Sequence, residues 1–138
     1  MDISKTERAY FNAAKSISML SDHRCRLGCV VVDRHRIISS GHNSKTKFHR
    51  IQSEIDNKYF PGYENKGPVH AEVSALIPLI KRRMDLSGTT LYVYRENRDG
   101  DLAMSRPCPR CLSLIKEQGI KKICYTTNDG YASERIVY

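Results

Sequence analysis

Four residues of this chain have types and a spacing suited to metal chemistry. His70 and Glu72 stand two positions apart, and Cys108 and Cys111 follow within the segment Pro-Cys-Pro-Arg-Cys. One imidazole and two thiolates are ligands that zinc prefers, and three protein ligands leave a fourth position open for water. Because structural zinc sites are closed by four protein ligands, this set favours a catalytic zinc site that performs hydrolysis.

Glu72 is predicted to carry protons and not to bind the metal. Residues two positions apart on a helix do not share a face, so His70 and Glu72 should not bind the same ion. Zinc lowers the pKa of bound water to about 7. Glu72 can then take a proton from that water and deliver it to a ring nitrogen and to a departing amine. Acid–base steps of this kind are worth about 10²–10⁴ in rate.

Cys108 and Cys111 are expected at the start of a helix. Their spacing lets both sulfurs face one point beyond the first turn, where Pro109 also fits because its missing N–H is harmless. The positive end of the helix dipole favours the thiolates that bind metal. A Cys-x-x-Cys pair alone also fits a structural zinc knuckle or a redox pair. However, a redox pair needs no upstream histidine, and no residue at motif spacing supplies the fourth ligand of a structural site.

The remaining cysteines and histidines form no comparable pattern. Cys29 and Cys124 lie in apolar, strand-like runs and are expected in the core. A second metal site near the middle of the chain would have to draw on four residues, for each of which a surface or core role is favoured: His23, Cys25, His42 and His49. An odd number of cysteines with one Cys-x-x-Cys pair is typical of a reducing compartment, not of a disulfide framework.

The elements that must position these residues alternate between helices and strands. Ser4 and Glu7 form a capping box that begins a first helix, which we expect to run to about Leu20. Apolar periodicity predicts, in order, a hairpin of strands at 29–32 and 37–38, a helix from His70, a strand at 89–94, a helix from Cys108 and a strand at 122–127. The last three form a βαβ unit with parallel strands. The order α-β-β-α-β-α-β predicts a mixed sheet with helices on its faces.

Two segments interrupt this pattern. Residues 44–68 are predicted to be an insertion over one edge of the active site, because a structureless loop of that length is unusual. Part of it should form a short helix, broken at 61–62, since apolar residues recur there at helical spacing: Phe48, Ile51, Ile55 and Tyr59. Pro78 should kink or end the helix that begins at His70, because an interior proline costs roughly 3 kcal/mol.

Composition narrows the class of protein. A length of 138 residues predicts a single domain over residues 1–138, and the chain has no run of about 18 apolar residues that could span a membrane. The first ten residues are polar and carry no apolar secretory signal, so a cytoplasmic location is expected. The formal net charge is +8, spread along the chain, which favours phosphate-bearing partners such as nucleotides or nucleic acid.

At its two motifs the chain resembles the zinc-dependent cytidine deaminase superfamily, whose signature is His-x-Glu followed by Pro-Cys-x-x-Cys. The resemblance covers roughly residues 24–125. It implies a three-layer α-β-α fold with a mixed central sheet and one catalytic Zn²⁺ per subunit, bound by His70, Cys108 and Cys111. It also implies Glu72 as the proton shuttle and a homo-oligomer. In relatives the residue at Ala71 contacts the base through its backbone N–H, and the one at Asn43 contacts sugar or base.

Within the superfamily the chain is most similar to deoxycytidylate deaminases, especially the small phage and viral ones. The similarity lies in segment 24–32, in the insertion before His70, and in Pro109, which tRNA adenosine and guanine deaminases share. Arg106 and the pair at 73–74 depart from the pattern of many relatives. This resemblance implies hydrolysis of dCMP to dUMP and ammonia, for pyrimidine deoxynucleotide supply.

A nucleotide substrate needs a cation for its phosphate, and arginine binds phosphate in bidentate fashion. Arg26 and Arg106 are therefore candidate substrate-binding residues, from a basic group that flanks the predicted loops and also contains Arg24, Lys45, Lys47 and Arg50. The sequence does not choose among them.

Three alternatives stay open. One is a polynucleotide deaminase that acts on tRNA adenosine or single-stranded DNA cytosine, with Phe48, Tyr59 and Phe60 as stacking candidates. The second is a deaminase of free cytidine. The third is a non-catalytic module stabilised by zinc, but a structural site would have no use for Glu72.

Overall fold

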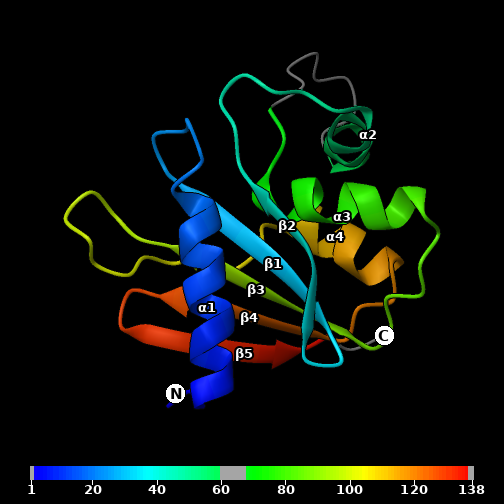
Figure 1. Ribbon diagram of the computed structural model, residues 1–138. Coiled ribbons are helices and arrows are strands. Elements are labelled where there is room, and N and C mark those ends of the chain that lie inside the picture. The colour runs from blue at the N-terminus through cyan, green and yellow to red at the C-terminus, as the bar shows by residue number, and fades with distance from the viewer. Residues whose placement is uncertain (1, 60–67, 137–138) are drawn as a thin grey trace.

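The computed structural model describes residues 2–59 and 68–136 of the chain, which form a sheet with helices on both sides (Figure 1). The helices are α1 (Lys5–Ser18), α2 (Arg50–Tyr59), α3 (Ala71–Lys81) and α4 (Pro109–Glu117). The strands are β1 (Leu27–Asp33), β2 (Arg36–His42), β3 (Thr89–Arg95), β4 (Lys122–Thr127) and β5 (Gly130–Arg135). Within these residues, no helix is both long and apolar enough to cross a membrane.

The sheet is mixed, as predicted. Its strand order is β2-β1-β3-β4-β5, with β3 and β4 parallel and the other neighbouring pairs antiparallel. The βαβ unit formed by β3, α4 and β4 is therefore confirmed. The predicted element order was incomplete, because it stopped at β4 and missed β5. Asp129-Gly130 at the β4–β5 turn is a hairpin signal that could have revealed this edge strand.

Both faces of the central strands are buried, which explains their continuous apolar runs. On one face, alternate strand residues pack against α3 and α4: Cys29, Val31, Leu91, Val93, Ile123 and Tyr125. On the other face, the intervening residues pack under Phe11 and Ala14 of α1: Val30, Val32, Tyr92, Tyr94 and Cys124. Figure 1 shows α1 alone on its side of the sheet, so the predicted three-layer arrangement is confirmed. Cys29 and Cys124 are core residues, as expected.

Local signals in the first part of the chain are read correctly from the sequence. The Ser4 hydroxyl accepts from the Glu7 backbone N–H and the Glu7 carboxylate accepts from the Ser4 N–H, which confirms the capping box. The helix ends at Ser18, slightly before the predicted Leu20. The hairpin strands extend beyond the predicted runs, and Arg34 and His35 between them have φ angles of 48° and 68°. A two-residue turn of this kind matches the right-handed twist of the strands.

The proline in α3 does not end the helix. The prediction was that Pro78 would kink or end the helix. Pro78 lies inside α3, which continues to Lys81, so the early end is wrong and the kink stays a prediction. Leu76 and Leu79 on either side of Pro78 are buried in the core, and their burial offsets the lost backbone hydrogen bond. The short helix predicted in the insertion is confirmed as α2, whereas the predicted break at 61–62 lies outside the described residues.

Gly41 in β2 lies where α3 comes very close to the sheet. A Cβ atom at this position would lie 2.4 Å from the backbone N of Ala75 and 2.7 Å from the carbonyl O of Ala71. Gly41→Ala is therefore expected to lower the free energy of unfolding by roughly 2–4 kcal/mol, because helix backbone must move to admit the methyl group. Urea unfolding measures this change.

Gly88→Ala is the matched control for Gly41→Ala. A Cβ at Gly88 meets only the Asp33 side chain, at the ordinary contact distance of 3.7 Å. We expect this variant to change the free energy of unfolding by less than about 1 kcal/mol. If the two variants unfolded at the same urea concentration, the close approach of α3 to β2 would be wrong.

Candidate metal centre

The candidate metal-binding residues meet at one end of the sheet. β3 and β4 are parallel, so their carboxyl ends lie at the same end of the sheet, and both α3 and α4 begin beside that end. His70 is the N-cap residue of α3 and Cys108 is the N-cap residue of α4, with Pro109 at the first helical position as predicted. Cys111 follows in the first turn of α4, so the two helix starts bring all three side chains together.

The three side chains form the one group of metal-ligating residues found in the described part of the chain. Their ligand atoms all lie within 4.8 Å of one another. His70 Nδ1 is 3.2 Å from Cys111 Sγ and 3.7 Å from Cys108 Sγ. A tetrahedral zinc ion with ordinary bond lengths would set nitrogen–sulfur distances of about 3.6 Å and a sulfur–sulfur distance of about 3.8 Å. Both the donor set and its spacing therefore fit a zinc ion.

The two thiols differ in acidity. A hydrogen bond from the Cys111 thiol, aided by His70 and opposed by burial, lowers the pKa of Cys108 to about 3. The pKa of Cys111 lies well above its usual value, because it donates that hydrogen bond and is buried. The hydrogen bond between the two thiols thus favours a thiolate at Cys108 alone, and metal binding by both sulfurs must displace the proton of Cys111.

Glu72 lies in the first turn of α3 and lines the same cleft as the metal group without being part of it. The separation has a different cause from the one predicted, since His70 is not a helical residue: its φ and ψ are −82° and 159°. Glu72 is only 5% exposed. Burial raises the pKa of its carboxyl, and the nearby charge of His70 partly opposes that shift.

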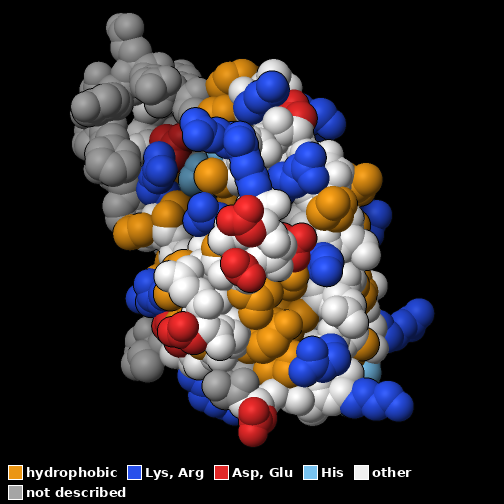
Figure 2. All heavy atoms as spheres, turned by 90° about the vertical axis from the view of Figure 1, so that its left-hand side faces the viewer, with side chains coloured by type: hydrophobic (Ala, Val, Ile, Leu, Met, Phe, Trp, Pro, Cys, Tyr) orange, Lys and Arg blue, Asp and Glu red, His pale blue; other side chains and the backbone are white. Residues whose placement is uncertain are grey.

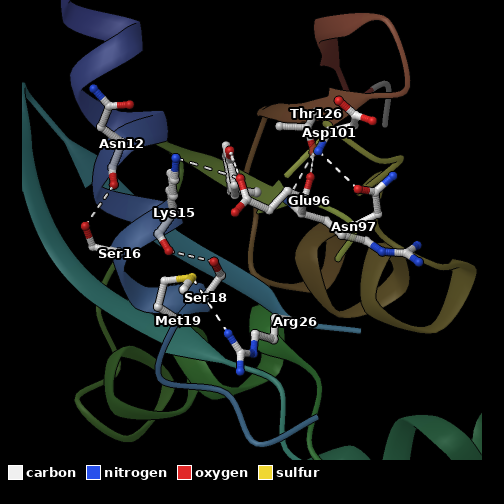
Figure 3. Close-up of polar contacts among 12 residues, drawn as sticks. Asn12, Lys15, Ser16, Ser18, Met19, Arg26, Glu96, Asn97, Asp101 and Thr126 are labelled. Atoms are coloured by element: carbon white, nitrogen blue, oxygen red, sulfur yellow. Dashed lines mark hydrogen bonds and ion pairs between the residues drawn. The ribbon is translucent and has the colours of Figure 1, made fainter. Parts of the chain in front are cut away.

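A cleft of about 290 Å³ opens beside the metal group. Three of the four predicted substrate-contacting residues line it, namely Asn43, Ala71 and Arg106. The fourth, Arg26, lines a neighbouring pocket instead. In Figure 3 the Arg26 side chain points to the sulfur of Met19, at a distance of 4.0 Å.

Asn43 shapes the wall of the cleft. It is 6% exposed, and its side-chain oxygen accepts from the Ser21 hydroxyl and from the Leu27 backbone N–H, at 2.7 and 2.9 Å. Its amide nitrogen donates to the carbonyl of Cys25 at 2.6 Å. These bonds tie the segment before β1 to the end of β2, so Asn43 has a structural role whatever else it contacts.

Arg106 is held by an ion pair that the sequence did not reveal. Its Nε and Nη2 donate to the Glu134 carboxylate at 2.6 and 3.1 Å, and the Tyr125 hydroxyl donates to the same carboxylate. Glu134 belongs to β5, the strand missing from the predicted order. Because the predicted sheet lacked this strand, no sequence pattern could place a carboxylate beside Arg106.

None of the other basic and aromatic candidates that the structure describes is found in the lining of the cleft. Among the described residues that line it, none comes from the group Arg24, Lys45, Lys47 and Arg50. Arg50 forms an exposed ion pair with Glu54 on its own helix. Phe48 is 62% exposed. The side chain of Tyr59, and Phe60 as a whole, lie outside the described residues. His23, Cys25, His42 and His49 form no metal group in the described part of the chain.

Two features of the site escaped the sequence prediction. Gln52 of α2 is fully buried and accepts a hydrogen bond from the His70 backbone N–H at 3.0 Å. It donates to Asp56, which pairs with Arg110 of α4 at 3.2 Å. Gln52 and Asp56 stand four apart on the apolar side of α2, a spacing that could have marked them. The insertion therefore links the starts of α3 and α4.

The second missed feature is Arg95, which lines the cleft from the end of β3.

Comparisons with known proteins agree with this geometry. The family described as "Cytidine and deoxycytidylate deaminase zinc-binding region" matches residues 4–127. The deoxycytidylate deaminase of Mycobacterium phage D29 is 32% identical over 127 residues, which are 84% of this chain and 90% of that protein.

Two solved structures show the same fold. The dCMP deaminase of cyanophage S-TIM5, in complex with dCMP and dUMP, aligns with a TM-score of 0.63 at 23% identity, covering 91% of this chain and 83% of that one. The cytidine deaminase of Burkholderia pseudomallei aligns with a TM-score of 0.65 at 16% identity, covering 96% of this chain and 93% of that one.

Proposed function

Because this chain belongs to the family of cytidine and deoxycytidylate deaminases, we propose that it hydrolyses dCMP to dUMP and ammonia. The observation that carries the proposal is a buried carboxylate, Glu72, in the cleft that His70 and Cys108 of the metal group also line, with the buried Cys111 beside them. A structural metal site gains nothing from a buried acid beside it, whereas a hydrolytic site needs a group that moves protons.

The metal group would hold one zinc ion per subunit, through His70, Cys108 and Cys111. When bound, zinc would lower the pKa of water, so that hydroxide could attack the amine-bearing carbon of the base at neutral pH. Glu72 would receive the proton of the attacking water, place it on the adjacent ring nitrogen, and pass the second proton to the amine as it leaves as ammonia. Burial favours the protonated form of Glu72, which suits an acid that must return its proton.

The first turn of α3 would also orient the base. Ala71 lines the cleft at the first helical position, where the backbone N–H has no acceptor within the helix. It can donate to the carbonyl oxygen of the pyrimidine. Asn43 lines the same cleft, and its amide nitrogen has a second N–H beyond the one that Cys25 accepts. That N–H can donate a hydrogen bond to a hydroxyl oxygen of the sugar.

Three observations support dCMP over the other substrates. The phage D29 relative is a deoxycytidylate deaminase, and the cyanophage structure contains dCMP and dUMP. The formal net charge of +8 favours a phosphorylated substrate over free cytidine. We also expect a single domain over residues 1–138 and a homo-oligomer, the latter by resemblance to the family.

A substrate panel tests the proposal. Ammonia release or mass shift is measured for dCMP, dCTP, cytidine, single-stranded DNA with one cytosine, and a tRNA stem-loop with a target adenosine. We expect kcat/KM for dCMP to exceed that for each other substrate by at least about tenfold, an energy difference of about 1.4 kcal/mol. A higher value for either polynucleotide would replace the proposal with polynucleotide deamination, and a higher value for cytidine would replace it with nucleoside deamination.

A further inference from the structure

A second, larger pocket adjoins the metal cleft. Its volume is about 480 Å³, and it shares His23, Cys25 and Arg95 with the cleft. It lies between the end of α1, the segment before β1 and the loop after β3, and its lining is rich in arginine: Arg24, Arg26, Arg95 and Arg98. Figure 2 faces this side of the molecule and shows Lys and Arg side chains gathered above a group of acidic ones. We call this the basic pocket.

Arg95 stands at the junction of the cleft and the basic pocket. It is the last residue of β3, where it pairs with Leu27 of β1, and its backbone N–H donates to the Thr126 hydroxyl at 3.1 Å. The strand therefore fixes the base of this side chain in the middle of the sheet. A cation held by a central strand is better positioned for recognition than one on a loop.

The guanidinium of Arg95 has donors to spare. One terminal nitrogen is 3.4 Å from the Met104 carbonyl O, the other is 3.6 Å from Cys25 Sγ, and the buried Nε has no hydrogen-bond partner. No carboxylate of the described residues forms an ion pair with it. A guanidinium has five N–H donors, and leaving them unmet in a partly buried place is costly. The position thus suits an anion with several acceptor oxygens.

The neighbouring charges leave this role to Arg95. Arg106 already donates two N–H groups to Glu134, and Arg26 lines the basic pocket but not the cleft. Glu96 is the acidic residue in the lining of the basic pocket, and its charge is engaged elsewhere. Its carboxylate accepts from the Tyr94 hydroxyl at 2.7 Å and lies 3.8 Å from Lys15 Nζ, a contact drawn in Figure 3.

We propose that Arg95 binds the 5′-phosphate of the substrate nucleotide at the junction of the cleft and the basic pocket. The base would occupy the cleft beside Glu72, and the phosphate would receive the N–H groups that Arg95 does not otherwise use. This inference rests on the proposed function and names the residue that makes the enzyme select a nucleotide. That residue differs from Arg26 and Arg106, which were named as candidates from the sequence.

The test compares dCMP with deoxycytidine, which lacks the phosphate. Arg95→Gln should lower kcat/KM for dCMP by about 10–100-fold, the range for a lost hydrogen bond to a charged group. It should change kcat/KM for deoxycytidine by less than about twofold, because that substrate has no phosphate to lose. Arg95→Lys should recover part of the preference for dCMP, since it keeps the charge without the bidentate geometry.

Arg36→Gln is the matched control, because Arg36 is exposed and lies at the opposite end of β1 and β2. It should keep the wild-type preference for dCMP. Zinc content and melting temperature are measured on every variant. If Arg95→Gln and Arg95→Lys lowered kcat/KM equally for dCMP and for deoxycytidine, Arg95 would have a structural role and the inference would be overturned. Loss of the preference in Arg26→Gln but not in Arg95→Gln would also overturn it.

The substrate preference of the wild-type enzyme distinguishes failure of this inference from failure of the proposed function on which it rests. If wild-type enzyme showed no preference for dCMP over deoxycytidine, the proposed function would fail before any variant was measured. A single-stranded oligodeoxynucleotide with one internal cytosine provides the other comparison. Deamination of that strand but not of dCMP would overturn both proposals. Preference for dCMP that depends on Arg95, with no activity on the strand, supports both.

Discussion

Glu72→Gln is expected to lower kcat for dCMP by at least about 10²–10⁴-fold while leaving the protein folded and the metal bound. Glutamine has nearly the shape of the buried glutamate but cannot accept and return a proton. The metal group does not include Glu72, so its three ligands are unchanged. Ammonia release under single-turnover conditions measures the rate, and elemental analysis measures the zinc.

Glu54→Gln is the matched control, because it makes the same chemical change at an exposed position on α2. Its kcat should stay within about twofold of wild type, as surface substitutions usually do. Glu72→Ala should lose activity to the same extent as Glu72→Gln. Normal turnover by either Glu72 variant would remove the proton-shuttle mechanism, whatever the metal content.

Cys108→Ala is expected to abolish stable zinc binding. It removes the thiol whose pKa is lowered to about 3, and it leaves His70 and Cys111 as a two-ligand site. Zinc should fall from about one ion per chain to less than a tenth of that after dialysis against a weak chelator. Deamination should be lost with it. Thermal unfolding should match that of wild-type protein stripped by a strong chelator, because the bound ion no longer stabilises the folded state.

Cys124→Ala is the control for Cys108→Ala, because it removes a cysteine thiol that is not part of the metal group. Cys124 is buried in the core beneath α1, on the opposite face of the sheet from α3 and α4. This variant should keep its zinc and lose only the modest stability of a small cavity, on the order of 1 kcal/mol. Full zinc stoichiometry in Cys108→Ala would mean that the ligand set contains a residue other than the three proposed.

The sequence predicted the structure best where a feature depends only on residues within one helical or β-turn of each other. The capping box at Ser4 and Glu7 and the helix start at Pro109 depend on contacts within a few residues, and both are found in the structure. Gly119 follows the end of α4, with a φ of 79° that residues other than glycine rarely adopt, and glycine at this position is a local helix-stop signal. The same locality explains why an early end at Pro78 was expected and not found, because helix propensity does not count the buried leucines beside it.

Distant contacts account for what the sequence missed. The partner of Arg106 is Glu134, 28 residues away on an edge strand, and the partner of the His70 backbone is Gln52, 18 residues before it. Neither pairing has a local signature, since it exists only once the sheet order and the position of α2 are set. Charge and spacing therefore named several candidate phosphate ligands without ranking them, and the structure distinguishes them by which pocket they line and which partners they already have.

The sequence by itself determined the candidate site: the three residues that form a potential metal-binding group, the acid that lines the same cleft, and the helix starts that present them. Residue type and local spacing suffice for that, because ligand chemistry and helix capping act over one turn. Only the tertiary structure brought His70 and Cys108 together across 38 residues of chain and left Arg95 with unmet donors between two pockets. Strand order and side-chain pairing decide such contacts, and they depend on the packing of the whole fold.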